Sequence, residues 1–363
     1  MALMPLTAAG AGTDPLLTEQ LTESGAAELL EILPDETRQL LQELNVTEMS
    51  HEAVFDLNLN GVLTVLLKTA GLLTREIGGT MLSVWGILLL SALLDGVRPD
   101  GGALPRVLHM ASVLACSMVL LTPLQALMSE VQTAMTATAS FQLVFVPVFA
   151  GIMAAGGQAV TAGKYATLTI GAAQSGGVLL SSVVLPLLRT TLAMSVVSSV
   201  APSVRMDGLC DWVRKTMTNL LSLMMTLFMT VLSLHGAVGG AADSLADKTV
   251  QFIIGSSIPV VGGALSQAYG TVRGSIRLLK TTVGAFGMIA AGALILPQLI
   301  SLMLWRTMLD LSAAAGERLG QREIGGLLRN ISALLGVLLG VVLCSGLMVI
   351  VSAGVMLLVR SGA

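Results

Sequence analysis

Charged and aromatic side chains are scarce in this sequence. Only 11% of its 363 residues are Asp, Glu, Lys or Arg, and only 3% are Phe, Trp or Tyr, whereas soluble domains carry about 25% charged residues. With 54% hydrophobic residues and a mean hydropathy of +0.85, a soluble fold would lack the charge needed to cover its surface. Because a backbone inside a bilayer must satisfy its own hydrogen bonds, the composition predicts an all-α, polytopic helical membrane protein.

The sequence also lacks the residue groups that carry catalysis or bind metals. Cys116, Cys210 and Cys344 are far apart, and the three histidines show no ligand spacing. There is no G-x-x-x-x-G-K-[ST] loop, no H-E-x-x-H motif and no G-x-S-x-G motif. We therefore expect no catalytic residue, no cofactor and no metal, so that the protein is not an enzyme. The sequence has no basic patch of the kind that binds nucleic acid, so we expect no nucleic-acid partner.

Acidic residues are concentrated at the N-terminus. Residues 1–56 contain eleven acids and a single base, Arg38, a net charge of −10, while the rest of the chain carries +7. Because bases near the membrane retain loops in the cytoplasm, we predict that 1–56 is an acidic, extracytoplasmic helical region. Within it, residues 1–13 resemble the remnant of a signal peptide. Residues 57–76 combine leucines with interrupting charges, which predicts an amphipathic interfacial helix.

Long apolar segments follow, and residues 77–360 are predicted to form a multi-pass membrane domain. A crossing needs about twenty apolar residues, which gives about seven spanning helices. Residues 190–202 either continue the fourth helix beyond Pro186 or form a short re-entrant piece. The predicted spans are 77–94, 107–128, 134–158, 165–188, 216–236, 281–304 and 330–356.

The loop charges conflict with a simple alternation of these spans. The segments 203–215, 273–280 and 306–329 are all basic, and basic loops favour the cytoplasm. Seven crossings with a cytoplasmic loop at 95–106 and an outer loop at 129–133 cannot place all three inside. A broken or re-entrant element within 237–280 would resolve the conflict.

The stretch 237–280 is too polar and too rich in glycine for an ordinary membrane helix. Asp243 and Asp247 share one helical face beside Lys248, and charges at membrane depth usually face a cavity or one another. Pro259 interrupts an apolar run and cannot lie in an unbroken helix. A broken helix lining a pathway, a packing kink and a solvated loop all remain open. The candidate pore, gate or hinge residues are Gly236, Gly240, Asp243, Asp247, Lys248, Gly255, Pro259, Gly262 and Gly263.

The same stretch carries a family resemblance. The run LSLHGAVGGAADSLADKTVQFIIGSSIPVVGGALSQA, followed by VRGSIRLLKTTVG, resembles the stage III sporulation protein AE family of endospore-forming bacteria. The segments NLNGVLTVLLK and VVLPLL add to the likeness, which extends over roughly residues 55–360. The matching motif residues are Gly236, Gly239, Gly240, Ala242, Asp243, Lys248, Gly255, Ile258, Pro259, Val260, Val261 and Gly262.

The resemblance implies a subunit of a transenvelope channel between mother cell and forespore. Such a subunit lies in the mother-cell membrane that surrounds the forespore and is needed for late forespore gene expression. Its implied partners are other membrane and ring-forming proteins of the same operon, with self-association as a further option, and a separate subunit is the ATPase. The residues alone also allow a self-contained secondary transporter or permease that uses Asp243, Asp247 and Lys248 in an ion or substrate path.

Overall fold

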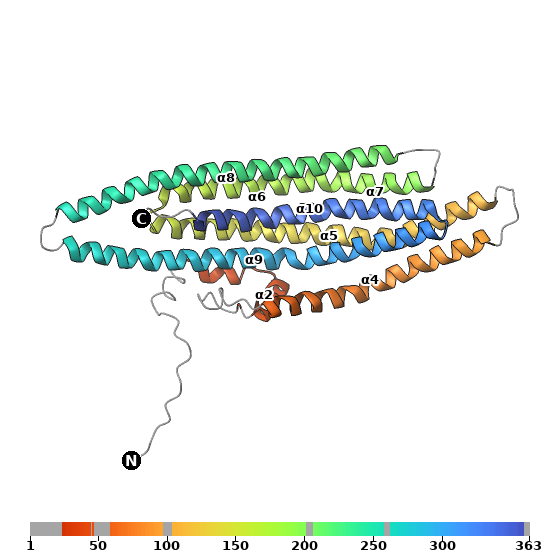
Figure 1. Ribbon diagram of the computed structural model, residues 1–363, viewed down its shortest axis with the longest axis horizontal. Helices are drawn as coiled ribbons and strands as arrows, with labels where there is room; N and C mark the ends of the chain where they lie inside the picture. The colour runs from red at the N-terminus through yellow and green to blue at the C-terminus, as the bar shows by residue number, and fades with distance from the viewer. Residues whose placement is uncertain are drawn as a thin grey trace, which may run out of the picture.

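The computed structural model describes residues 24–44, 46, 59–96, 104–200, 206–257 and 262–358. These residues form an elongated helical bundle, in which no strand occurs (Figure 1). The predicted fold class is therefore confirmed. In chain order the elements are η1 (Ala26–Leu30), α2 (Asp35–Glu43), α4 (Leu59–Gly96), α5 (Leu104–Ala155), α6 (Ala159–Leu179), the π-helical turn η2 (Leu180–Val184), α7 (Leu185–Val200), α8 (Asp207–Ser257), α9 (Gly262–Arg318) and α10 (Arg322–Leu358).

Several helices are far longer than a membrane crossing requires. Helix α5 has 52 residues and α9 has 57, which correspond to about 78 and 86 Å at 1.5 Å per residue. The hydrocarbon core of a bilayer is about 30 Å thick. Within the described residues, six helical segments are long and apolar enough to cross a membrane: Ile77–Asp95, Val107–Ala155, Ala159–Val200, Gly208–Ala246, Val272–Arg318 and Arg322–Leu358.

The predicted number of seven spans is not confirmed, because the predicted loop at 129–133 does not exist. Residues 107–128 and 134–158 were separated on account of the polar run between them, but α5 continues through it. The hydroxyl of Thr133 donates to the carbonyl of Ser129 at 3.1 Å, and that of Thr136 donates to Gln132 at 3.0 Å. Hydroxyls that bond within the helix remove the need for a loop. The predicted interfacial helix at 57–76 is likewise continuous with the first span, in α4.

Helices α6 and α7 are also joined. Pro186 has no N–H and cannot complete a regular α-helical turn with the residue four positions before it. The backbone forms the wider π-helical turn η2 at this point and then continues as α7. Residues 190–200 therefore extend the preceding helix, and the alternative of a short re-entrant piece is wrong.

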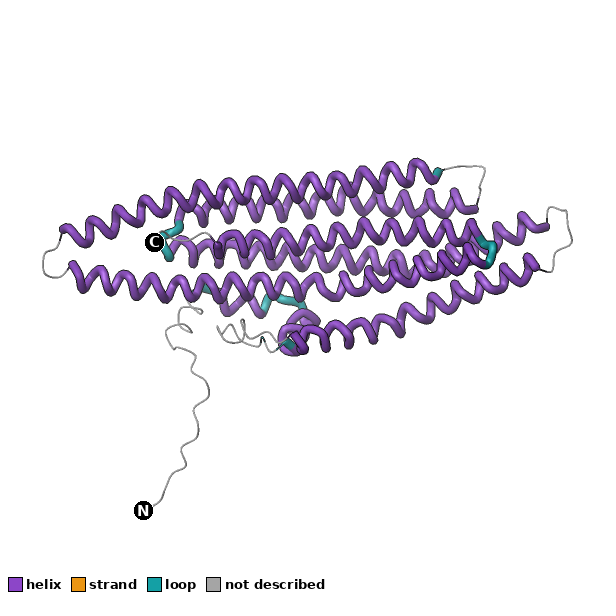
Figure 2. The backbone as a smooth tube through the Cα atoms, viewed as in Figure 1, coloured by secondary structure: helices purple, strands orange, loops and turns teal. Residues whose placement is uncertain are grey.

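The direction of the helices resolves most of the conflict among the basic segments. Helices α4, α7 and α9 end, and α5, α8 and α10 begin, at one end of the bundle, which we call the α9–α10 end (Figure 2). The basic segments 203–215 and 306–329 therefore share this end. The segment 273–280 lies towards the opposite end, the α5–α6 end. The continuous helix α5 removes one of the predicted crossings, which brings these two basic segments to the same end.

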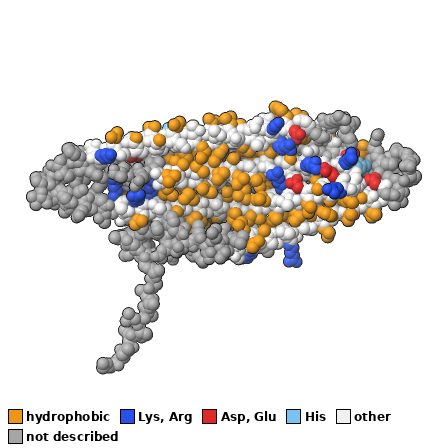
Figure 3. Space-filling model, in the orientation of Figure 1, with side chains coloured by type: hydrophobic (Ala, Val, Ile, Leu, Met, Phe, Trp, Pro, Cys, Tyr) orange, Lys and Arg blue, Asp and Glu red, His pale blue; other side chains and the backbone are white. Residues whose placement is uncertain are grey.

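An apolar belt separates two groups of charged side chains (Figure 3). On α9 the belt extends from Lys280 to Arg306, about 39 Å along the axis. On α6 and α7 it extends from Lys164 to Arg189, about 38 Å. Both lengths match a hydrocarbon core of about 30 Å with part of each interfacial layer. The remainder of the bundle, towards the α9–α10 end, extends beyond this belt. It includes the apolar segment Ile77–Asp95 of α4, where Trp85 donates to Ser312 and Ser91 donates to Gln321.

Aromatic stacking and close glycine contacts hold the centre of the bundle. The rings of Phe141, Phe145 and Phe149 stack along α5 with centroids 5.4 Å apart, and Tyr165 of α6 meets Phe149 edge-on at 5.6 Å. Helix α9 packs on this column through Gly287, where a Cβ would lie 2.2 Å from the Phe145 ring. Small residues allow this close approach between helices.

The described part of the acidic N-terminal region packs on the side of the bundle. Ala26, Leu29, Leu33 and Leu41 are buried in the same apolar cluster as the α5 phenylalanines. Helix α2 contacts α9, and η1 contacts α5 (Figure 1). The location of this region outside the cytoplasm stays a prediction.

Candidate functional site

The turn between α5 and α6 is the centre of a cluster of buried polar side chains, which includes Gln158, Asp243 and Lys280. Helix α5 ends at Ala155, and Gly157 in the turn that follows adopts a φ of +84°, which favours glycine. The N–H of Gln158 donates to the Met153 carbonyl at 2.9 Å, and that of Gly157 donates to Ala154 at 3.0 Å. This glycine-based end is a common way to terminate a helix. It allows α6 to begin at Ala159, beside α8 and α9.

Asp243 of α8 caps the start of α6. Its Oδ1 accepts a hydrogen bond from the N–H of Val160 at 3.0 Å, and its Oδ2 accepts one from Thr161 at 2.9 Å. These first-turn donors have no partner within α6, and the positive end of the helix dipole favours a carboxylate there. The Asp243 side chain is only 4% exposed. It therefore joins α6 and α8 through two residues, Val160 and Asp243, that are 83 positions apart in the chain.

A glycine one turn earlier makes this cap possible. A Cβ on Gly239 would lie 2.6 Å from Thr161 Oγ1 and 3.0 Å from Thr161 Cα, so a larger residue would push α8 away from α6. Gly239 and Asp243 lie on one buried face of α8 together with Leu232 and Gly236. We call Gly239 and Asp243, with Val160 and Thr161, the α6–α8 clamp.

Helix α9 holds the same turn through basic side chains. The ammonium of Lys280 donates to Gln158 Oε1 at 2.7 Å, and both side chains are buried. The Nε of Arg273 lies 3.5 Å from the Gly156 carbonyl. Positive charges beside the C-terminal end of α5 interact favourably with its dipole. The turn is thus bound by an acid from α8 and by bases from α9.

The structure brings together few of the predicted candidates. Asp243 contacts α6 and Gly236 is buried, whereas Lys248 is exposed on the surface of α8. Asp247 lies one helical turn beyond Asp243, and Gly255 lies near the end of α8. The clamp thus uses only one member of the predicted acidic pair. Gly240 lies beside Gly239 in α8, and Gly262 and Gly263 open α9.

The predicted break in the central stretch lies between two long helices. Helix α8 ends at Ser257 and α9 begins at Gly262, and Pro259 lies outside the described residues. On either side the backbone is continuously helical for 51 and 57 residues. The described parts of 237–280 are the adjoining ends of two antiparallel helices, and a re-entrant element between them stays a prediction.

Two features of the structure were not predicted from the sequence. Lys280 and Gln158 were not expected to meet, because one was assigned to a basic loop and the other to the end of a span. Glu130 is the only Asp, Glu, Lys or Arg between Val107 and Ala155. An acid inside so long an apolar run is a usable signal, but the predicted loop at 129–133 contains it.

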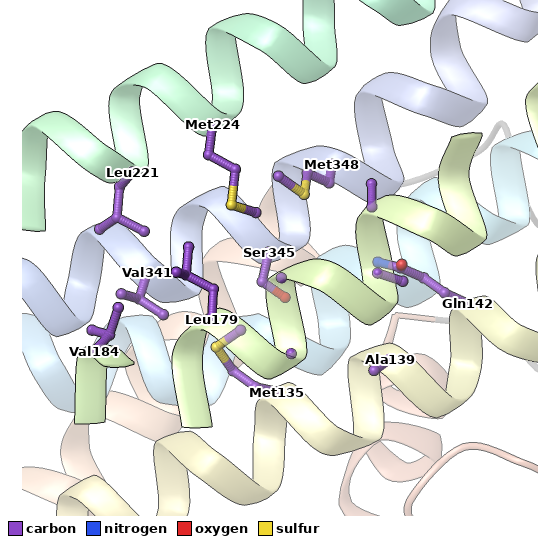
Figure 4. Close-up of a pocket in the computed structure, with 14 residues that line it drawn as sticks. Met135, Ala139, Gln142, Leu179, Val184, Leu221, Met224, Val341, Ser345 and Met348 are labelled. Atoms are coloured by element: carbon purple, nitrogen blue, oxygen red, sulfur yellow. The ribbon is translucent and has the colours of Figure 1, made fainter. Parts of the chain in front are cut away.

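A cavity lies in the centre of the bundle between α5, α6, α8 and α10 (Figure 4). Met135, Leu221, Met224 and Met348 give it an apolar lining, while Gln142 and Ser345 are its polar side chains. Its empty volume is about 530 Å³, including the part open to the outside. This lining suits the binding of an apolar group and offers no residues that would catalyse a reaction.

Among the described residues, no three His, Cys, Asp or Glu side chains come close enough to hold a metal ion. The charged contacts near the α5–α6 turn are those between side chains and backbone or amide groups. These contacts hold α5, α6, α8 and α9 together at the α5–α6 turn.

Comparisons with known proteins agree on one family. The family model described as Stage III sporulation protein AE matches residues 44–359. The stage III sporulation protein AE of Bacillus subtilis (strain 168) is 30% identical over 148 residues, which are 41% of this chain and 37% of that relative. The alignment thus spans little more than a third of the relative's length. No solved structure matches.

Proposed function

Because the chain belongs to the stage III sporulation protein AE family, we propose that it is an integral membrane subunit of the transenvelope channel between mother cell and forespore. In this role it supports late forespore gene expression without performing catalysis. The observation that carries the proposal is the family match over residues 44–359, which includes the whole described membrane domain. Its location would be the mother-cell membrane around the forespore, with ring-forming and other membrane proteins of the operon as partners.

The geometry of the clamp supports a structural role. Asp243, the most unusual charge in the family-like stretch, is buried and engaged by two backbone donors. A carboxylate held in this way is poorly suited to bind and release an ion in each cycle. This observation favours a channel subunit over a self-contained transporter whose coupling residues are Asp243, Asp247 and Lys248.

Liposomes containing only the purified protein separate these two functions. A channel subunit should give no uptake of solute driven by an ion gradient when its partners are absent. Gradient-coupled uptake that is lost in Asp243→Asn would contradict the subunit role and support the transporter.

A forespore reporter tests the sporulation role. In a sporulating host that lacks its own family member, the full chain should restore a late forespore reporter, and Asp243→Ala should restore little of it. Lys248→Ala, on the same helix but exposed, serves as the matched control and should restore full activity. A reporter that stays silent with a well-expressed wild-type chain would contradict the proposal.

We further propose that the α9–α10 end faces the mother-cell cytoplasm. Arg214, Lys215, Arg306, Arg322 and Arg329 gather near that end, as the positive-inside rule requires. Reporter insertions at 100 and 203 should therefore be cytoplasmic, and an insertion at 260 should be outside. Opposite locations for 100 and 203 would contradict the six-span arrangement.

A further inference from the structure

A polar stripe lies on the exposed face of α5 inside the apolar belt. Ser129, Thr133, Thr136 and Ser140 are exposed and recur at helical spacing, and Glu130 is exposed beside them. Against lipid tails the Glu130 carboxylate would be unfavourable, whereas the hydroxyls of Thr133 and Thr136 already bond to carbonyls of α5. A face of this composition within a spanning helix normally lines protein or water.

Helix packing places the stripe in the half of the belt nearer Arg306. Helix α5 is antiparallel to α9, since Phe149 contacts Gly284 and Phe145 contacts Gly287. Further along, Glu130 and Thr133 line a hollow with Pro297 of α9. Pro297 lies between Lys280 and Arg306, the two charged limits of the belt on α9.

The hollow itself is rich in hydrogen-bond acceptors. Its lining includes Glu130 and Thr133 of α5, Glu36 and Thr37 of α2, and Gln298 of α9, around about 990 Å³ of empty space that is partly open to the outside. The Oε1 atom of Gln298 is buried without a hydrogen-bond partner. A buried amide oxygen without a partner is costly unless water or a ligand reaches it.

The helix packed over this face is itself polar. Asp35 and Glu36 of α2 are exposed, and Glu43 forms an ion pair with Lys68 of α4. Charges cannot remain solvated beside lipid tails. Because α2 is docked at the level of the belt, the side of the bundle that carries it requires water.

The opposite side has the character of a lipid-facing surface at the same depth. The central cavity joins Met135 and Ala139 of α5 to Leu221 and Met224 of α8, which sets the two helices in register. There, Leu223 and Leu227 of α8 are each 56% exposed. The two sides of the belt therefore differ in chemistry although they share one depth.

From these contrasts we propose that the polar stripe of α5, with Gln298 and the docked helix α2, lines a water-filled vestibule that favours hydrated cations. Glu130 supplies the negative charge, and the amide and hydroxyl oxygens supply acceptors. The vestibule opens on one side of the bundle, and lipid covers the other. The inference rests on the placement in the membrane and not on the sporulation role.

Cysteine accessibility in intact membranes tests the vestibule. In a full-length chain whose Cys116, Cys210 and Cys344 are replaced by alanine, Thr133→Cys and Thr136→Cys should react with a charged, impermeant methanethiosulfonate reagent. Leu223→Cys and Leu227→Cys are the matched controls at the same depth and should remain unlabelled until the membrane is dissolved in SDS. Equal labelling of both pairs, or labelling of the leucine positions alone, would overturn the proposal, as would no labelling of either pair.

The charge preference has its own readout. Glu130 lies one helical turn from Thr133, so reaction at Thr133→Cys should be about tenfold faster with a cationic than with an anionic reagent of equal intrinsic reactivity. Glu130→Gln should reduce this ratio to near unity, while Glu36→Gln should leave most of it in place. A ratio unchanged by Glu130→Gln would overturn the cation preference. The liposome and reporter assays of the sporulation role are separate measurements, so either inference can fail alone.

Discussion

Replacing Asp243 with alanine is expected to destabilise the protein by about 3 kcal/mol, because hydrogen bonds to a charged group contribute more than neutral ones and their loss leaves buried donors unpaired. The two donors are the N–H groups of Val160 and Thr161, at 3.0 and 2.9 Å from the carboxylate. Thermal or denaturant unfolding in detergent, followed by circular dichroism, measures the change. Helix α6 should loosen from α8 in this variant, because Asp243 holds the first turn of α6.

Two variants sharpen this expectation. Asp243→Asn keeps one amide oxygen as an acceptor and should lose about half as much stability. Lys248→Ala removes an exposed side chain one turn further along α8 and should change stability by no more than about 0.5 kcal/mol. Equal effects of Asp243→Ala and Lys248→Ala would show that the clamp does not exist.

Gly287→Ala is expected to be the most damaging small substitution in the centre of the bundle. The new Cβ would lie 2.2 Å from two carbons of the Phe145 ring. That ring is stacked between Phe141 and Phe149 with centroids 5.4 Å away on each side, so it has little freedom to move. Overpacking of this kind costs about 1–3 kcal/mol, which the same unfolding measurement detects.

The same helix supplies the control. A Cβ at Gly292 would meet nothing within 4 Å, and alanine is a better helix former than glycine by about 1 kcal/mol. Gly292→Ala should therefore be neutral or stabilising. The double variant Gly287→Ala/Phe145→Leu should recover part of the loss, because leucine leaves more room. A Gly287→Ala protein as stable as Gly292→Ala would contradict the packing of α9 on α5.

The helical membrane fold followed from composition and from the long apolar runs, but the number of spans did not. A prediction from hydropathy ends a span wherever polar residues occur together. The run from Ser129 to Ser140 is polar, so α5 was predicted as two spans. It remains helical because its threonine hydroxyls bond to carbonyls within α5 and because, as we propose, one face meets water. A window of about twenty residues cannot distinguish a loop from a polar stripe on a 52-residue helix.

The family-like stretch drew attention to Asp243, but the sequence could not show its role. Its partners are two backbone N–H groups 83 and 82 residues earlier in the chain, and backbone groups leave no mark in a sequence. The glycine at 239 could have suggested a close helix contact, yet glycine is so common here, with 39 residues, that spacing alone did not identify the contact. Lys280 and Gln158 were unpredictable for the same reason.

The most direct test of the α6–α8 clamp is a disulfide between Thr161→Cys and Gly239→Cys. A Cβ at Gly239 would lie 3.3 Å from that of Thr161, close to the separation of about 3.5–4.5 Å in disulfides. In a chain without its native cysteines, with a protease site inserted at 203, the two halves should stay joined after oxidation and cleavage. The pair Thr161→Cys and Val238→Cys should separate, because Val238 is exposed on the adjoining face of α8. Efficient cross-linking of the Val238 pair, with none at Gly239, would contradict the account.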